Sequence, residues 1–495
     1  MNRRSFVGAF FAMSVVLAAC GRDSGTTAET TKPPTAETSK PEVTTAKPPD
    51  SAATTGEGTT ATPETPAATD APPVTDPDPC AGVTLEATET GVSADTITVL
   101  VMADVGSELA PGLFQGSIDG TKAWAKAVNA AGGLACRKVE VLEWDSKINP
   151  AESTNGFLEA CSKAAALVGS TSLFIGDVSI IEKCPDKAGA ATGIADIPER
   201  AVDALHQCSP NVFSVGGVAG SCPYSGTGPR DYTAMVGVFK QYEKIAGASL
   251  HGIYLIPSDL PSTIQSSMPT IRALNANGFV SDGEFGVSGR AEQAVYAEYV
   301  ASMKTNGSNI AIDGSNDSAM IKLRTEAVAQ GLDDSGVIWA CSLACYTSTF
   351  KDDPNAEGTY LWLPFLPFEE RSSNGELDSF LTAIGNDFPQ SWAVGAWNSG
   401  RAFETAINKI VAADGPNGIT RSKIIETMGT LTDFDSNKWI GPIDFSKKSI
   451  GSCFVLLHLE GGQYVRKYPT EVGTMDCAAE NLAAWSGDSA AEYKG

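Results

Sequence analysis

The stretch Thr96–Ala103 (TITVLVMA) is a run of apolar, mostly β-branched residues, long enough for a strand buried on both faces. Apolar residues then recur at helical spacing from Ile118 to Ala130, and Gly132–Gly133 ends this helix. Lys138–Trp144 (KVEVLEW) alternates between polar and apolar residues, which is typical of a second strand. The order strand, helix, strand predicts a βαβ unit with two parallel strands.

The same alternation continues along the chain. We expect a helix over residues 155–166, and further strands at Leu173–Gly176 (LFIG), Gly252–Ile256 (GIYLI), Asn309–Asp313 (NIAID) and Gly336–Ala340 (GVIWA). Repeated alternation predicts an α/β fold with mostly parallel sheets covered by helices on both faces. The roughly 415 residues from Cys80 onward exceed one ordinary domain, so we predict two Rossmann-like lobes that divide near residue 218.

The first residues have the layout of a secretory signal. Arg3 and Arg4 precede the apolar run Phe6–Ala19, which is shorter than the roughly 20 residues that span a bilayer. Cys20 directly follows Leu-Ala-Ala, which resembles a bacterial lipobox, whose cysteine is acylated and becomes the new N-terminus. We therefore expect a signal peptide over residues 1–19 and a lipid on Cys20. An ordinary signal peptide is the alternative, and the two arginines leave Sec and twin-arginine export both open.

Residues 20–79 are expected to form a disordered tether. They are rich in Thr, Pro and Ala, contain no aromatic residue, and have Val43 and Val74 as their only larger aliphatic residues. Such a segment buries too little apolar surface to offset the entropy of ordering. It is either an unmodified spacer or an O-glycosylated stalk. The predicted location is the outer face of the cell membrane, and the net charge of -24 argues against nucleic acid as a partner.

The cysteines agree with export to an oxidising compartment. Without Cys20, ten of the eleven cysteines remain, an even number. They fall into sequence-local pairs: Cys80 with Cys136, Cys161 with Cys184, Cys208 with Cys222, Cys341 with Cys345, and Cys453 with Cys477. Other connectivities stay open at this point. A zinc site is disfavoured, because there is no Cys-x-x-Cys and the three histidines are scattered, so we expect no metal and no cofactor.

An ordered series of segments resembles the type I periplasmic binding proteins of the leucine/isoleucine/valine-binding kind. The series runs over about residues 91–470: GVSADTITVLV (91–101), GSIDGTKAWAKAVNAAGG (116–133), RKVEVLEWDSKINPAES (137–153), LFIG (173–176), GIYLIPSD (252–259), LNANGF (274–279), IDGSNDSAMIKLRTEAVAQGL (312–332), SWAVGAWNSGRAFETAINKI (391–410) and IGPIDFS (440–446). The resemblance implies a hinged solute-binding protein that closes on a small molecule and delivers it to an ABC transporter permease.

The resemblance also implies where the chain passes between lobes. Crossings are expected near Gly217, Thr347 and Gly441, with the ligand at the carboxyl ends of the strands. Lobe I would then take about residues 91–217 and 348–440, and lobe II about 218–347 and 441–475. Residues 476–495 would be a C-terminal tail. We expect a monomer.

The family's carboxylate-binding positions are altered here. Amino-acid-binding members use a Ser after the third strand and a Thr in the following turn. An alignment without gaps puts Ile180 at the first position, whereas a shift by one residue puts Ser179 there, and Ala201 replaces the Thr. Arg200 is a candidate clamp for an anion, with a solvated surface arginine as the alternative.

Other candidates come from the remaining loops. Phe114 falls on the family's aromatic lid position, with core packing as the alternative. The family's acid that pairs with a ligand ammonium falls near Ser342, so that charge is missing. Asp313 and Asp317 are candidates to replace it, although Asp317 is equally suited to cap a helix.

Two further aromatic positions belong to this set. Trp392 and Trp397 fall where the family places aromatics near the cleft, and we take Trp397 as the ligand candidate, with core packing expected for at least one of the two. Tyr224 lies in an insertion over residues 219–230 that is expected to shape the mouth of the cleft.

The incomplete set disfavours an α-amino acid without excluding it, and leaves amides, organic acids and aromatic compounds as ligand classes. A ligand-sensing lobe for a signalling partner is an alternative function, because a fold does not fix a function. An extracellular hydrolase is the second alternative. It is disfavoured by the lack of Gly-x-Ser-x-Gly, His-Glu-x-x-His and Gly-x-x-x-x-Gly-Lys motifs, so we expect no enzyme activity.

Overall fold

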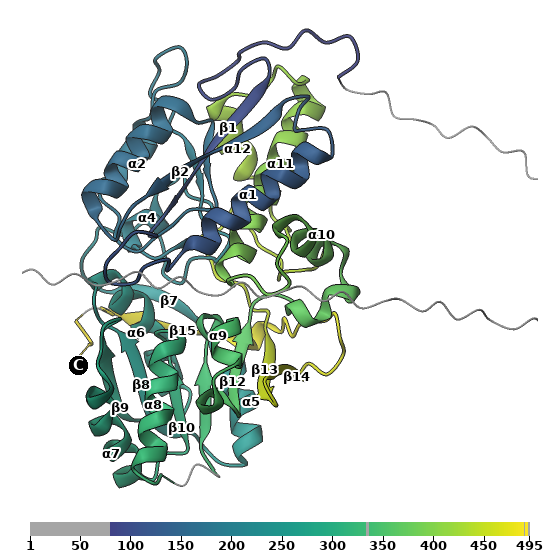
Figure 1. Cartoon of the computed structure of the whole chain (residues 1–495). Helices are drawn as coiled ribbons and strands as arrows, with labels where there is room; N and C mark the ends of the chain where they lie inside the picture. Colours follow the sequence, from purple (N-terminus) through teal and green to yellow (C-terminus); the bar gives the residue numbers. More distant parts are fainter. Residues whose placement is uncertain (1–79, 333–335, 490, 494–495) are drawn as a thin grey trace, which may run out of the picture. The chain divides into compact units, whose positions relative to one another are not determined.

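The computed structural model describes residues 80–332, 336–489 and 491–493, which all belong to one compact unit, Thr75–Gly495. The expected signal peptide, Cys20 and the tether lie outside the described residues. The described part of the chain contains two large sheets, each covered by helices (Figure 1). We call the part built on the first sheet lobe I and the part built on the second sheet lobe II.

The first sheet is entirely parallel. Its central strand β1 pairs with β2 on one side and with β3 and β4 on the other, and β5 and β6 extend β3 and β4. The strands are β1 (Thr96–Ala103), β2 (Lys138–Asp145), β3 (Ala166–Val168), β4 (Thr171–Ser172), β5 (Ala195–Ile197) and β6 (Arg200–Ala201). Successive side chains of β1 point to opposite faces of the sheet, and the two faces pack in different core clusters. Val99 packs in the cluster that contains Trp124, whereas Leu100 packs in the cluster that contains Phe157.

The second sheet has the order β14-β13-β12-β11-β10-β8-β9. The five strands β8 to β12 pair in parallel. Strands β13 and β14 pair in antiparallel fashion at the β12 edge of the sheet. The strands are β8 (His251–Pro257), β9 (Val280–Val287), β10 (Ile310–Asp313), β11 (Ile338–Cys341), β12 (Thr359–Leu363), β13 (Val455–Glu460) and β14 (Gln463–Tyr468). A separate antiparallel pair joins β7 (Arg230–Met235) to β15 (Leu482–Gly487).

Helices cover both sheets. In lobe I they are α1 (Gln115–Ala130), α2 (Pro150–Lys163), α3 (Ser179–Lys183), α4 (Ala204–Cys208), α10 (Gly375–Ile384), α11 (Trp392–Asp414) and α12 (Arg421–Met428). In lobe II they are α5 (Gly237–Ala246), α6 (Pro261–Ala276), α7 (Tyr296–Asn306), α8 (Asp317–Ala329) and α9 (Ser348–Lys351). None of the helices in the described part of the chain combines the length and hydropathy that crossing a membrane requires.

Helices α1 and α11 approach each other closely because glycines lie at their contact. A Cβ at Gly120 would lie 2.3 Å from the carbonyl oxygen of Ala393, and a Cβ at Gly400 would lie 2.2 Å from the ring of Trp124. Larger side chains at these positions would push the helices apart. This contact sets the position of the first turn of α11, which carries Trp392.

The α/β fold with parallel sheets is confirmed, but one predicted helix has other bounds and one predicted strand is wrong. Helix α2 begins at Pro150, where the Asn149 side chain accepts the backbone N–H of Ala151 at 2.8 Å, and it ends before the predicted limit at 166. The third strand is β3 with β4, interrupted at Gly169 (φ +77°), and not LFIG over 173–176, which is a loop. Thus the apolar run just after α2 supplies the strand, and LFIG follows it at the strand ends.

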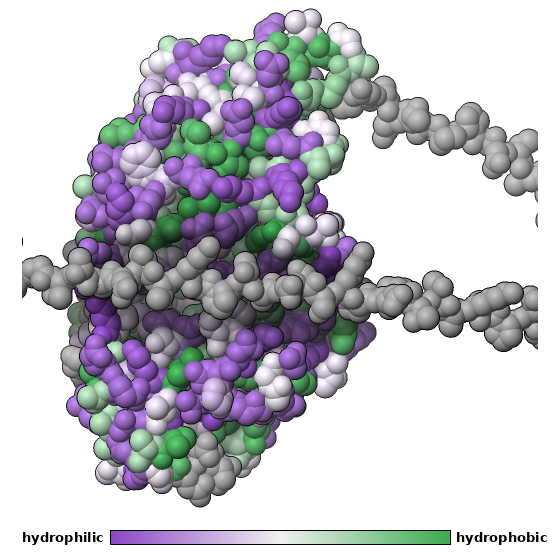
Figure 2. All heavy atoms as spheres, viewed as in Figure 1, coloured by the Kyte–Doolittle hydropathy of each residue, from purple (hydrophilic) through white to green (hydrophobic). Residues whose placement is uncertain are grey.

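The positions at which the chain crosses between the lobes also differ from the sequence prediction. Strand β12 pairs with β11, so the chain stays in lobe II well beyond Thr347 and leaves it only after Leu363. Residues 482–487 of the expected tail form β15 against β7, because their apolar side chains pack on the cluster around Tyr242. On the face shown in Figure 2, hydrophilic residues predominate and apolar residues occur in separate groups.

Five disulfides join the sequence-local pairs, which confirms the pairing considered above. They are Cys80–Cys136, Cys161–Cys184, Cys208–Cys222, Cys341–Cys345 and Cys453–Cys477. Each Cα–Cα distance is 6.0 Å or less. The bridges therefore connect segments that the fold already brings together.

Candidate functional site

A cavity of about 490 Å³ is lined by residues of both lobes. From lobe I it receives the loop after β1, the segment from β5 to β6, and the start of α11. From lobe II it receives the loops after β10 and β11, together with parts of β7, β8, α5 and α6. Since the carboxyl ends of parallel strands are the usual place for ligands in open α/β folds, this cavity is the candidate ligand site.

The lobe I wall is built around Trp392. The ring of Phe114, which is 4% exposed and precedes α1, packs edge-to-face on Trp392 with 5.2 Å between ring centroids. The guanidinium of Arg200 lies over the Trp392 ring, 5.7 Å from its centroid. An arginine held against an aromatic ring loses less freedom when it binds an anion.

Arg200 is available to a ligand. Its side chain is 34% exposed, and no described residue accepts a hydrogen bond from it. Its nearest acid is Glu199, with 3.9 Å between Nε and a carboxylate oxygen. Among the described residues that line the cavity, Arg200 is the one with a positively charged side chain. The sequence prediction of an anion clamp thus falls at the cavity wall.

Glu199 lies behind Arg200 and is almost fully buried. The Thr171 hydroxyl donates to its carboxylate at 3.1 Å. Burial raises the pKa of this carboxyl, and the Arg200 charge and the Thr171 hydrogen bond oppose the rise. Gly395 of α11 makes room for it, because a Cβ there would lie 2.1 Å from Cγ of Glu199.

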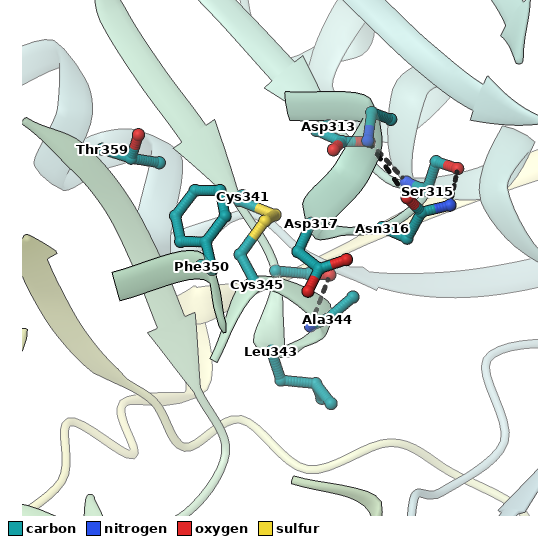
Figure 3. The surroundings of a disulfide bond; sticks show 12 residues. Asp313, Ser315, Asn316, Asp317, Cys341, Leu343, Ala344, Cys345, Phe350 and Thr359 are labelled. Atoms are coloured by element: carbon teal, nitrogen blue, oxygen red, sulfur yellow. Dashed lines mark hydrogen bonds between the residues drawn. A yellow bond between two sulfur atoms is a disulfide. The ribbon is translucent and has the colours of Figure 1, made fainter. Parts of the chain in front are cut away.

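The lobe II wall includes Asp313, the last residue of β10, which is shown in Figure 3. It also includes Ser342, which directly follows β11. Asp313 is 1% exposed, and the backbone N–H of Ser315 donates to its Oδ1 at 2.7 Å. Its Oδ2 has no partner within the described part of the chain. Burial raises the pKa of Asp313 to about 8, so this carboxyl is mostly neutral at pH 7. It is therefore poorly suited to balance a ligand ammonium.

Asp317 does not line the cavity. It is the first residue of α8, whose cap is the Asn316 side chain, and its carboxylate accepts the Thr347 hydroxyl at 2.9 Å. Ser342 lines the cavity and caps a 3₁₀ turn at Leu343–Cys345, with its hydroxyl accepting from the Ala344 N–H at 3.4 Å.

One group of residues has the composition of a metal site. Single ligand atoms of Asp313, Cys341 and Cys345 lie within 4.8 Å of one another. The two sulfur atoms are joined in a disulfide and are not thiolates, the form that binds metals (Figure 3). The cluster in this state does not offer a metal a complete ligand set.

Besides Asp317, three candidate residues from the sequence lie outside the lining of the cavity. Ser179 is at the start of α3, and Tyr224 accepts a hydrogen bond from Gln265 at 3.1 Å while its ring contacts the Arg230 guanidinium. Trp397 is fully buried, and its indole N–H donates to Glu376 at 2.6 Å. Trp392, and not Trp397, is thus the tryptophan of α11 that faces the cavity, which corrects the expectation from the sequence.

Sequence reasoning missed several lining residues of lobe II, which are Met235, Phe239, Tyr242, Tyr254 and Trp362. A signal existed for Tyr254, an aromatic residue inside the otherwise aliphatic run GIYLI. Phe239 and Tyr242 share one face of α5 at helical spacing, a pattern that core packing also produces. Their place at a cavity depends on how far α5 stands from the sheet, which no local pattern specifies.

The comparisons with known proteins agree with this geometry. A family model described as periplasmic binding protein matches residues 96–463. No curated protein sequence matches the chain. A fatty acid ABC transporter substrate-binding protein from Thermomonospora curvata is 16% identical, with a TM-score of 0.57 over 79% of this chain and 98% of that chain.

Two further solved structures are similar. A solute-binding protein of an ABC transporter from R. palustris, in complex with benzoate, is 15% identical, with a TM-score of 0.56 over 75% of this chain and 95% of that chain. The branched-chain amino acid transporter substrate-binding protein LivJ from Streptococcus pneumoniae, in complex with isoleucine, is 15% identical. Its TM-score is 0.53, over 75% of this chain and 100% of that chain. At such identities these structures show the fold alone. Because the family model spans most of the folded unit, the chain belongs to the periplasmic binding protein family.

Proposed function

We propose that this chain is the solute-binding component of an ABC transporter, tethered to the outer face of the membrane by a lipid on Cys20, and that its ligand is an organic acid with an apolar body. The cavity between the lobes supports capture by hinge closure, because a ligand there touches both lobes. The observation that carries the ligand class is the Arg200 guanidinium at the wall of a cavity lined mostly by apolar residues. It lies over the Trp392 ring, is in loose ionic contact with Glu199, and donates no hydrogen bond to a described residue.

An α-amino acid fits these residues less well. Its ammonium needs an ionised acid, and burial keeps Asp313 mostly neutral at pH 7. The other buried acid, Glu199, already faces Arg200 and Thr171. A monocarboxylate needs only a cation, which Arg200 supplies, and hydrogen-bond donors from lobe II. Two of the similar structures are named for a fatty acid and for benzoate, which supports this class for the present chain.

Calorimetry on the folded unit tests the ligand class. We expect benzoate and octanoate to bind, and benzamide, leucine and isoleucine to bind weakly or not at all. Arg200→Ala should weaken benzoate by about ten- to a hundredfold, since a hydrogen bond to a charged group contributes about 1.5–3 kcal/mol.

The matched control is Arg290→Ala. Arg290 is an exposed arginine beside the lining residue Gly289, and it pairs only loosely with Glu108, at 3.8 Å. The benzoate affinity of this variant should stay within about twofold of the wild-type affinity. The variant changes the net charge by the same amount as Arg200→Ala but leaves the proposed clamp intact. Micromolar leucine binding without benzoate binding would contradict the proposed ligand class.

A further inference from the structure

Part of the cavity extends into the interior of lobe II. We call this part the lobe II chamber; its apolar and aromatic walls are Met235, Phe239, Tyr242, Tyr254, Ile312, Ala340 and Trp362. These residues come from β7, α5 and the strands β8, β10, β11 and β12, and none comes from lobe I. All of them except Trp362 are 9% exposed or less.

The strand register explains why the sheet side of the chamber is continuous. Ile312 pairs with Tyr254 on one side and with Ala340 on the other, so the three side chains stand in a row on one face of the sheet. Across from this row, α6 presents the small residues Ser267 and Thr270. A small side chain in the row, Ala340, and small side chains on the helix leave space between the sheet and its covering helices.

The chamber contains no ionised group among its described wall residues. The polar groups there are the hydroxyls of Tyr242 and Tyr254 and the indole N–H of Trp362, and the Tyr242 hydroxyl has no hydrogen-bond partner in the described part of the chain. Burial raises the pKa of Tyr242 far above its ordinary value, so it stays neutral. A charged group would be costly in this environment, whereas methylene or ring carbons gain by leaving water.

The same cavity also contains the Arg200 side chain in lobe I. We infer that the ligand is an amphipathic monocarboxylate whose extended aliphatic chain enters the lobe II chamber while its carboxylate meets Arg200. This inference rests on the proposed function for the carboxylate, but the chamber is a separate feature of lobe II. A molecule that occupies both parts bridges the lobes and favours the closed form, because it binds that form better than the open one.

A chain-length series tests the chamber. Calorimetry or competition binding with butanoate, octanoate and dodecanoate should show affinity rising about fourfold for each buried methylene, which corresponds to ~0.8 kcal/mol. Ala340→Leu fills the chamber from the sheet, and Ser267→Leu fills it from α6. Each should weaken dodecanoate at least tenfold and leave butanoate within about twofold. The matched control Ala276→Leu, at an exposed position of α6 outside the cavity lining, should change neither.

Alcohols of the same length separate the two proposals. Dodecanol lacks the carboxylate, so its binding should be insensitive to Arg200→Ala and sensitive to Ala340→Leu and Ser267→Leu. If butanoate binds through Arg200 but longer acids gain nothing, the chamber inference is overturned and the proposed function stands. If dodecanol binds in the chamber and Arg200→Ala has no effect on any acid, the chamber stands and the carboxylate clamp fails. Two differently placed chamber variants that keep the melting temperature but leave dodecanoate binding intact would also overturn the inference.

Discussion

Asp313 and Cys341 are direct neighbours at the carboxyl ends of β10 and β11, where they are paired in parallel register. The Asp313 carboxyl therefore lies beside the Cys341–Cys345 disulfide, and one of its oxygens has no hydrogen-bond partner within the described residues. Ser315 is the backbone donor to the other oxygen. A carboxyl in this position, at the wall of the candidate ligand cavity, couples proton binding to stability.

The first prediction is a pH-dependent effect of Asp313→Asn. The folded pKa of Asp313, about 8, is above the value of 3.8 for the free group. The stabilisation from holding the proton is thus complete below about pH 4 and is lost as pH rises toward 8, at roughly 1.4 kcal/mol per pH unit. Asn needs no proton, so the melting temperature of the variant relative to the wild type should rise between about pH 5 and pH 8.

Asp317→Asn controls for removal of a nearby acid, since Asp317 instead accepts the Thr347 hydroxyl. Thermal melts of both variants across this pH range give the comparison. A melting difference for Asp313→Asn that stays constant with pH would show that this carboxyl ionises normally.

The second prediction concerns the five disulfides. Thiol labelling of the denatured, unreduced folded unit should find no free thiol among its ten cysteines. Reduction should lower the melting temperature, because each lost bridge typically costs about 2–5 kcal/mol. Peptide mapping without reduction should recover the five sequence-local pairs, and the recovery of crossed pairs would contradict the structure.

The third prediction concerns anchoring. Cys20→Ala should release the protein from the membrane fraction or block its processing, because no thiol is left to acylate. Thr27→Ala, within the expected tether, should leave the protein in the membrane fraction. Metabolic labelling with a fatty acid should mark the wild type and not the Cys20 variant. A processed Cys20→Ala protein that remains membrane-bound would argue against lipid anchoring.

Much of the fold followed from local patterns. Thr96–Ala103 has the bounds expected from its apolar run, because a strand buried on both faces needs an uninterrupted apolar stretch. The strand after α2 was predicted at residues 173–176 and lies earlier, at β3 and β4. Gly169 interrupts the short apolar run of this strand, and the run was taken for the end of the preceding helix. β12 could not be assigned to lobe II from its sequence, because both sheets accept a run such as TYLWL and only pairing with β11 decides.

The site was less predictable than the fold. Arg200 and Phe114 were proposed because the resemblance aligned their loops with ligand-binding positions, and both line the cavity. The chamber residues of lobe II were not predicted from the sequence. The positions of Tyr254 and Tyr242 in the sequence pattern are the same for a residue that packs in a core and for one that lines a cavity. The difference between Trp392 and Trp397 depends on which side of α11 faces the cavity, and the two residues are five positions apart, far from equivalent on a helix of 3.6 residues per turn.

The last prediction separates these two tryptophans. Trp392 touches Arg200 and Phe114 at the cavity, so Trp392→Leu should weaken carboxylate binding about tenfold by loosening the clamp, with a small change in melting temperature. Trp397 is fully buried, packs edge-to-face on Phe380, and donates to Glu376. Trp397→Leu should therefore destabilise the fold by about 3–5 kcal/mol, while the protein that remains folded binds normally. Melting curves and calorimetry on both variants should give opposite patterns, because Trp392 contacts the proposed clamp Arg200 whereas Trp397 fills the core. If Trp397→Leu weakens the ligand without lowering stability, the orientation of α11 at the cavity is wrong.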